Sequence, residues 1–139
     1  MKPDHAAMLR DQYEHFWTER LASFPDGWGD LLIEFFARLG KLNDFHARDR
    51  RSAWVKLDFL LYPGGGGMNI KATPLHSPST SWTRPQREYL AQTLEWINVE
   101  IQKVCEVCGS PSEALFKTQM GEGRDRLLCK HHLAEAVIA

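Results

Sequence analysis

All three cysteines of this 139-residue chain fall in its last third, in two short motifs. The first reads Cys-Glu-Val-Cys-Gly, and the second, roughly twenty residues later, reads Cys-Lys-His-His. Thiolates and neutral imidazoles are the ligands that Zn²⁺ prefers, usually four of them in a tetrahedron. The types and spacing of these side chains therefore predict one zinc ion, with Cys105, Cys108, Cys129 and His132 as its ligands.

The backbone around Cys129 decides which of the two adjacent histidines completes the set. Good helix formers follow His132, so a helix starting at Cys129 is expected. Residues 129 and 132 then share one face of the helix, and His131 points elsewhere as the alternative fourth ligand. In the first motif, Gly109 permits a positive φ that helps the chain turn around the ion.

Four protein ligands make a closed site, which is usually structural, whereas a catalytic zinc keeps an open position. If His132 were not a ligand, a position would remain for water. Two further alternatives are three unrelated cysteines and a disulfide. Three cysteines would leave one of them unpaired, which argues against a disulfide scaffold and favours a reducing compartment.

The segment between the two motifs is expected to form a β-hairpin. Residues 115–118 and 126–128 have strand character, and Gly121 and Gly123 supply the turn. A zinc turn, a hairpin and then a helix that starts at a ligand make the layout of a treble-clef finger. We therefore predict a treble-clef-like zinc finger at the C-terminal end.

Two helices are predicted in the first forty residues. Apolar residues recur at helical spacing from Asp4 to Phe24, and Pro25 ends that run. The second helix, 31–39, is apolar nearly all round, so it should be central in the core; Asp26 or Asp30 could cap it, and Gly40 should end it. The first helix either packs on the core or presents aromatic residues to a partner: Tyr13, Phe16 and Trp17.

The middle of the chain predicts a β-hairpin and a longer helix. Residues 54–62 alternate apolar and polar side chains, the glycines at 64–67 form a tip, and a second strand starts at Met68. A helix with a capping box is expected from Thr83, and its apolar stripe leads into Cys105. The arginine-rich segment 41–51 is expected to be a solvated loop, with phosphate contact as the alternative.

These elements give an α+β fold, in which helices pack on a small antiparallel sheet and carry the zinc finger. The expected division is a body at 1–82, with two helices and a β-hairpin, and a connecting helix with the finger at 83–139. The formal net charge is −1, and the 43% hydrophobic and 25% charged contents are ordinary for a globular protein. Neither a signal peptide nor a membrane span is apparent, so a cytoplasmic location is expected.

Three segments resemble a family of small uncharacterised bacterial and phage proteins. They are Asp26-Gly27-Trp28, Val55-Lys56, and Cys105 to Gly109 with the later Leu128-Cys129 and His132. The resemblance implies a zinc site and a bacterial cytoplasm, or the host cytoplasm for a phage-encoded chain. It implies no activity, because the family has none assigned.

The expected function is that of a zinc-stabilised, protein-binding accessory or inhibitory factor without catalytic activity. The closed metal site, the near-zero charge and the lack of a catalytic constellation all favour another protein as the partner. The alternative is a zinc finger that binds nucleic acid, because basic side chains cluster in the finger: Lys117, Arg124, Arg126 and Lys130. A metal-dependent nuclease is disfavoured, because the finger has no Asp-His pair.

Overall fold

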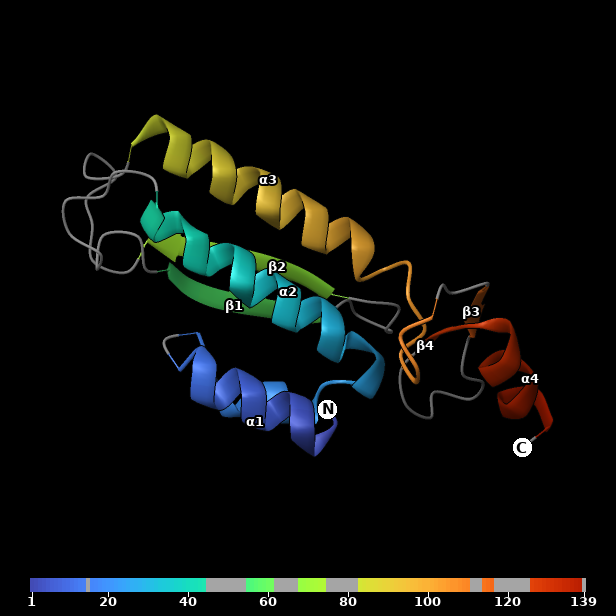
Figure 1. The fold of residues 1–139 in the computed structure, drawn as a ribbon. Coiled ribbons are helices and arrows are strands. Elements are labelled where there is room, and N and C mark those ends of the chain that lie inside the picture. Colours follow the sequence, from blue (N-terminus) through green and yellow to red (C-terminus); the bar gives the residue numbers. More distant parts are fainter. Residues whose placement is uncertain are drawn as a thin grey trace.

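The computed structural model describes residues 1–14, 16–44, 55–61, 68–74, 83–110, 114–116 and 126–138. It is an α+β structure with two separate antiparallel hairpins (Figure 1). The α-helices are α1 (Pro3–Gln12), α2 (Gly29–Gly40), α3 (Arg84–Glu100) and α4 (Lys130–Ile138). The strands are β1 (Val55–Leu61), β2 (Met68–Pro74), β3 (Ala114–Phe116) and β4 (Arg126–Leu128). Short 3₁₀ helices are η1 (Glu19–Ser23), η2 (Asp26–Trp28) and η3 (Lys41–Asp44).

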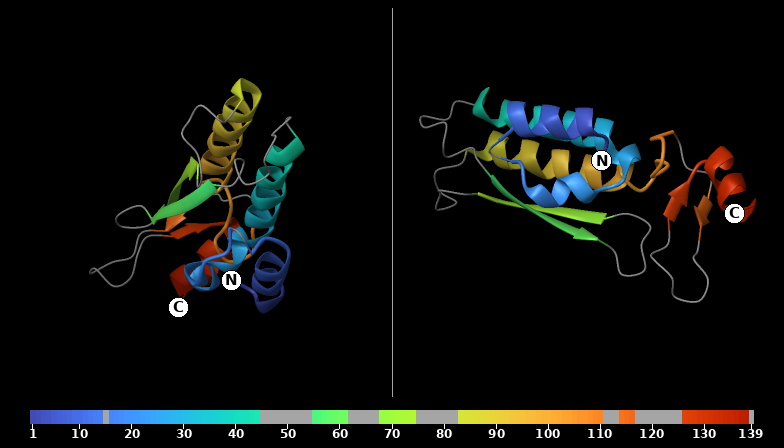
Figure 2. Two further views of the ribbon diagram at one scale, coloured as in Figure 1. Left: turned by 90° about the vertical axis from the view of Figure 1, so that its left-hand side faces the viewer. Right: turned by 90° about the horizontal axis from the view of Figure 1, so that it is seen from below.

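The body is a layer of helices on the hairpin β1–β2. Helices α2 and α3 lie side by side, α3 packs on β2, and α1 packs on α2 (Figure 1). The finger, made of β3, β4 and α4, lies at one end of this body, beyond the last turn of α3 (Figure 2). Among the described residues, the main core cluster extends no further along the chain than Ile101, and Leu128 of β4 is buried separately from it.

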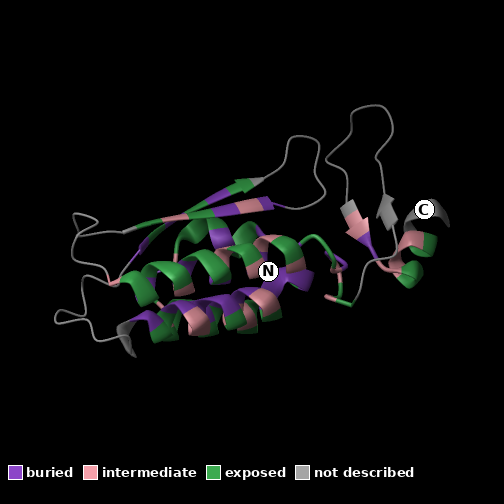
Figure 3. Ribbon diagram, turned by 90° about the horizontal axis from the view of Figure 1, so that it is seen from above, coloured by how far each residue is buried: buried purple, intermediate pink, exposed green. Residues whose placement is uncertain are grey.

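The hairpin β1–β2 confirms the predicted alternation. Val55, Leu57 and Phe59 are buried, whereas the intervening Lys56 and Asp58 are exposed. Phe59 pairs with Ile70 in the antiparallel register, and Ile70 is also buried. One face of the hairpin therefore closes the core beneath the helices, and Figure 3 shows buried residues gathered where these elements meet. The predicted glycine tip lies outside the described residues.

The helix expected from Asp4 to Phe24 is wrong in its second half. Helix α1 ends at Gln12, and Tyr13 leaves the helical region with φ −132° and ψ 45°. The break lets Phe16 pack on Phe36, with ring centroids 5.7 Å apart, and lets Phe24 contact Phe59 at 5.5 Å. The burial of these rings outweighs local helix propensity, which is only moderate for aromatic residues.

Helix α2 also differs from its prediction. It begins at Gly29, and neither Asp26 nor Asp30 caps it. Instead, Asp30 lies 3.1 Å from Nε2 of His5, and the half-buried imidazole packs over Gly29. The helix is amphipathic rather than apolar all round, because Asp30 and Glu34 face solvent. Its buried side chains are Leu32, Phe35, Phe36 and Leu39.

Helix α3 starts and packs as predicted. Thr83 and Gln86 form the capping box, and Gln86 Nε2 also donates to the backbone oxygen of Leu42 at 3.2 Å. Leu90, Ile97 and Ile101 are buried on the predicted stripe. This helix therefore crosses the body and delivers the chain to Cys105 in a fixed position.

Asn98 on α3 holds the backbone of β2 with both ends of its side-chain amide. Its Oδ1 accepts from the Ile70 N–H at 2.7 Å, and its Nδ2 donates to the Ile70 carbonyl at 3.0 Å. Replacing Asn98 with alanine leaves both partly buried backbone groups unsatisfied, so we expect a loss of about 2 kcal/mol in unfolding free energy. Urea unfolding measures it. Gln102→Ala is the control, since its exposed hydrogen bond should contribute little; equal losses would contradict the prediction.

Candidate metal centre

The first half of the site is a tight turn at Cys105–Gly109. The Gly109 N–H donates to the Cys105 carbonyl at 2.9 Å, and the Cys105 N–H donates to the Ser110 carbonyl at 2.6 Å. Gly109 has the predicted positive φ, +79°, a backbone conformation that residues with a Cβ rarely adopt. Inside the turn, the Val107 N–H donates to the Cys105 sulfur at 3.4 Å.

The second half comes from the junction of β4 and α4. Strand β4 ends at Leu128, and the Leu133 N–H closes the first helical turn on the Cys129 carbonyl at 2.8 Å. Cys129 and His132 therefore lie on the same face of this turn, as predicted. The Glu106 N–H donates to the Leu127 carbonyl at 2.9 Å, which holds the two halves of the site against each other.

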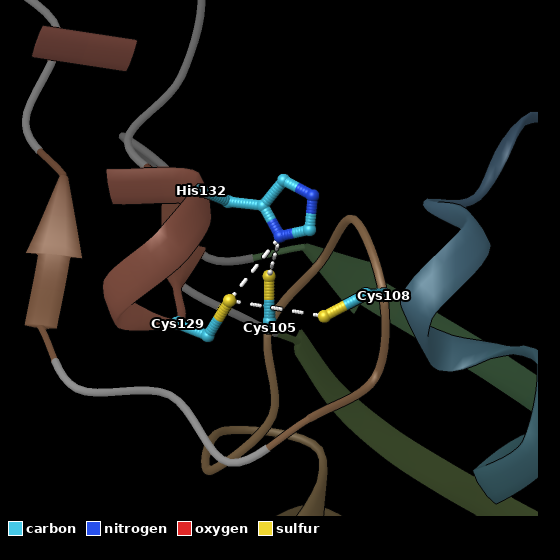
Figure 4. A group of neighbouring side chains, drawn as sticks. All are labelled: Cys105, Cys108, Cys129 and His132. Atoms are coloured by element: carbon cyan, nitrogen blue, oxygen red, sulfur yellow. Dashed lines mark hydrogen bonds between the residues drawn. The ribbon is translucent and has the colours of Figure 1, made fainter. Parts of the chain in front are cut away.

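The four predicted ligands converge, with their ligand atoms all within 4.8 Å of one another (Figure 4). Nδ1 of His132 lies 3.2 Å from the Cys129 sulfur and 3.5 Å from the Cys105 sulfur, and the sulfurs of Cys108 and Cys129 are 3.8 Å apart. A tetrahedral zinc ion has edges of about 3.8 Å between two sulfurs and about 3.6 Å between sulfur and nitrogen, given its usual bond lengths. These three separations are close to the edges of such a tetrahedron, and the cluster can hold a metal ion.

The structure also separates the two histidines. The His132 ring faces the sulfurs, whereas Nε2 of His131 pairs with Glu135 at 3.0 Å on the exposed side of α4. His131, His132 and Glu135 form a second group of neighbouring ligand atoms, but His131 and Glu135 are largely exposed. His132, not His131, therefore completes the Cys₃His set.

The hydrogen bonds of the cluster favour deprotonation of the Cys108 thiol at a lower pH than that of Cys129. Hydrogen bonds from the side chain and the backbone of Ser110 lower the pKa of Cys108 to about 6. The backbone N–H of His132 acts to lower the pKa of Cys129 too, but desolvation and the neighbouring Cys108 and Cys105 thiols outweigh it and raise that pKa. Cys108 is also the exposed member of the cluster, so it should be the first thiol to meet an incoming ion.

We therefore expect Cys108 to react before Cys129 when the metal-free protein is treated with iodoacetamide at pH 7. A thiol with a pKa near 6 is mostly thiolate at that pH, so its modification should be roughly ten-fold faster. Peptide mass spectrometry during a time course measures the order. Protein loaded with zinc is the control and should resist modification at both residues; faster labelling of Cys129, or no protection by zinc, would contradict the assignment.

The turn at Cys105–Gly109 is packed directly on the body. The Gly27 N–H donates to the Glu106 carbonyl at 2.8 Å. A Cβ on Gly27 would lie 2.0 Å from the Cys105 carbonyl oxygen, and one on Gly109 would lie 3.0 Å from the Gly27 carbonyl oxygen. The turn at Cys105–Gly109 therefore packs on the Asp26-Gly27-Trp28 segment, which the sequence analysis singled out only as part of a resemblance.

The residues predicted for partner binding are placed unevenly. Phe16 is buried in the core, so its prediction as a partner-binding residue is wrong. Tyr13 is half-buried against Phe36. Trp17 is also half-buried, and the guanidinium carbon of Arg10 lies 5.0 Å from the centroid of its ring. Arg124 lies outside the described residues, and Arg126 is described only as the first residue of β4.

Comparison with protein-family models, with curated proteins and with solved structures gave no match for this chain. The resemblance drawn from the sequence motifs therefore stays an expectation. Among the described residues, no helix is both long and apolar enough to span a lipid bilayer.

Proposed function

We propose that the Cys₃His cluster holds one structural zinc ion in a treble-clef-like finger. The observation that carries this proposal is the convergence of the four ligand atoms, with three of their separations close to the edges of a tetrahedral zinc site. Three thiolates and one imidazole suit zinc better than the hard cations, which prefer oxygen ligands. The order of elements supports the finger type, since a metal-binding turn, the hairpin β3–β4 and α4 with two ligands at its start follow one another.

In this proposal the zinc has a structural rather than a catalytic role. Four protein ligands leave no position for water or substrate, and closed sites of this composition are structural. The strands β3 and β4 are only three residues each, too short to be stable as an isolated hairpin. Metal binding therefore supplies the stabilisation that the finger lacks.

The function that we infer for the whole chain is that of a cytoplasmic, protein-binding accessory or inhibitory factor. Support comes from the hydrogen-bonded packing of the turn at Cys105–Gly109 on the body, a net charge of −1, and apolar side chains that reach the surface. Met8 on α1 is 40% exposed, Val99 on α3 is 45% exposed, and the half-buried Trp17 adds an aromatic edge. Tryptophan in particular is among the residues that contribute most to binding when a partner covers them.

Two measurements test this proposal. Cobalt substitution of the metal-free protein should give the visible absorption of a tetrahedral thiolate site, and a spectrum of octahedral type would refute the zinc assignment.

Quantitative affinity capture, with the zinc-loaded chain as bait and the metal-free chain as control, should retain a stoichiometric protein partner. If the chain instead shifts a DNA or RNA probe with steep salt dependence and retains no protein, the nucleic-acid alternative replaces it.

A further inference from the structure

A groove of about 410 Å³ runs along the seam between α2 and α3. One side is lined by Glu34, Ala37 and Arg38, which lie on one face of α2, and by Lys41, the first residue of η3. On α3 it is lined by Tyr89, Gln92 and Thr93, at the same helical spacing. Its volume is within the range of ligand-binding clefts, and the finger contributes nothing to it.

The guanidinium of Arg38 is held in place from two sides. It stacks on the Trp96 ring, 3.6 Å from the ring centroid, and its Nη2 pairs with Glu34 at 2.8 Å. The side chain is nevertheless 35% exposed, and a guanidinium has five N–H donors, so donors remain for a ligand. Because the stacking has already fixed the side chain, binding an anion there costs little further conformational entropy.

The charge of the groove favours an acidic ligand. Arg38 and Lys41 are both basic, and Glu34 is the one acidic residue in the lining. Glu34 is already engaged by Arg38, and no described acidic side chain pairs with Lys41. Gln92 can donate a further hydrogen bond from its exposed amide. The result is a polar groove with a positive end.

We propose that this groove binds an acidic segment of a partner protein, with a carboxylate held by Arg38 and Lys41. The inference rests on the proposed protein-binding function and locates it on the body rather than on the finger. Arginine, tryptophan and tyrosine are the residues that most often dominate binding energy, and Arg38, Trp96 and Tyr89 gather here. Two cations beside a glutamate are too few for a nucleic-acid backbone, whose affinity is built from many phosphate contacts.

The test uses zinc-loaded full-length protein and a capped hexapeptide of alternating glutamate and serine. In ¹H–¹⁵N NMR spectra, the Trp96 indole N–H and the Arg38 Nε–H signals should shift on titration, and the other tryptophan signals should not. A capped glutamine–serine hexapeptide is the ligand control and should leave both signals in place. Shifts spread over the surface, or equal shifts with the glutamine peptide, would overturn the proposal.

Matched variants locate the site. Arg38→Gln should weaken the binding of the acidic peptide at least about ten-fold, because it removes a charge-assisted hydrogen bond. Lys41→Gln, at an exposed helix end where folding is not at risk, should weaken it about three-fold. Arg84→Gln removes a cation from an exposed pair with Glu88 outside the groove and should have no effect. Wild-type affinity in both groove variants would overturn the proposal.

The affinity capture distinguishes failure of this inference from failure of the proposed function. If Arg38→Gln and wild-type baits retain the same partner equally, the groove assignment fails and the protein-binding function stands. If no partner is retained but the acidic peptide still binds the groove, the general function fails instead. A single-stranded oligonucleotide that moves the Trp96 and Arg38 signals more strongly than the peptide would refute a protein ligand.

Discussion

Protein in which Cys105 is replaced by serine is expected to lose its zinc and, with it, the folded finger. The Cys105 sulfur is buried at the centre of the cluster, and serine supplies no thiolate in its place. Structural zinc contributes about 10 kcal/mol or more to the folding of small fingers. Metal analysis of protein purified without chelator should find about one zinc ion per chain in the wild type and essentially none in the variant.

The body should remain folded in that variant, because none of the described residues beyond Ile101 belongs to its core cluster. NMR signals from β4 and α4 should therefore collapse to unfolded positions, whereas those from β1 and β2 stay dispersed. His131→Ala is the matched control, since that neighbouring imidazole pairs with Glu135 and faces away from the sulfurs. Full zinc content in the Cys105→Ser protein, or loss of zinc from His131→Ala, would show that the ligand set is wrong.

Gly27→Ala is expected to be strongly destabilising although it leaves every predicted metal ligand in place. The added Cβ would lie 2.0 Å from the Cys105 carbonyl oxygen and 2.7 Å from the carbonyl carbon of Glu106. Both atoms belong to backbone, which cannot rotate aside as a side chain can, so the turn must separate from η2. The hydrogen bond from the Gly27 N–H to the Glu106 carbonyl should be lost as well. We expect a loss of about 3 kcal/mol in unfolding free energy.

Gly40→Ala is the control for this substitution, because a Cβ there meets nothing within 4 Å. Alanine restricts the unfolded chain and suits a helix better than glycine, so Gly40→Ala should raise stability by about 0.5–1 kcal/mol. Urea unfolding of the zinc-loaded proteins measures both changes. If Gly27→Ala proves as stable as the wild type, the metal-binding turn is not seated on the body in the way the structure shows.

The consequence of this packing is that the finger is not an independent appendage. The turn at Cys105–Gly109 is held on one side by Gly27 of the body and on the other by Leu127 of β4, through the backbone of Glu106. Zinc at the cluster would therefore fix the position of η2, from which α2 begins. This argues that metal binding stabilises the start of α2 as well as the finger.

The sequence alone was sufficient to find the four side chains that cluster, because metal ligation needs specific atom types at short spacings. Two motifs restricted the choice to Cys105, Cys108, Cys129 and one of two histidines, and helix periodicity favoured His132. The hairpin β1–β2 and the capping box of α3 were also predicted, since alternation and capping are local patterns. The treble-clef identity of the finger remains a proposal.

Tertiary structure decided the features that depend on contacts between distant segments. Helix α1 stops at Gln12 because the rings of Phe16 and Phe24 gain more from burial than the chain gains from continuing the helix. Gly27 has no local signal for its role, since the carbonyl groups that it accommodates lie almost eighty residues later. Arg38 and Trp96 likewise meet only when α2 and α3 pack. Local spacing can specify which atoms bind a metal, whereas steric fit between segments exists only in the folded chain.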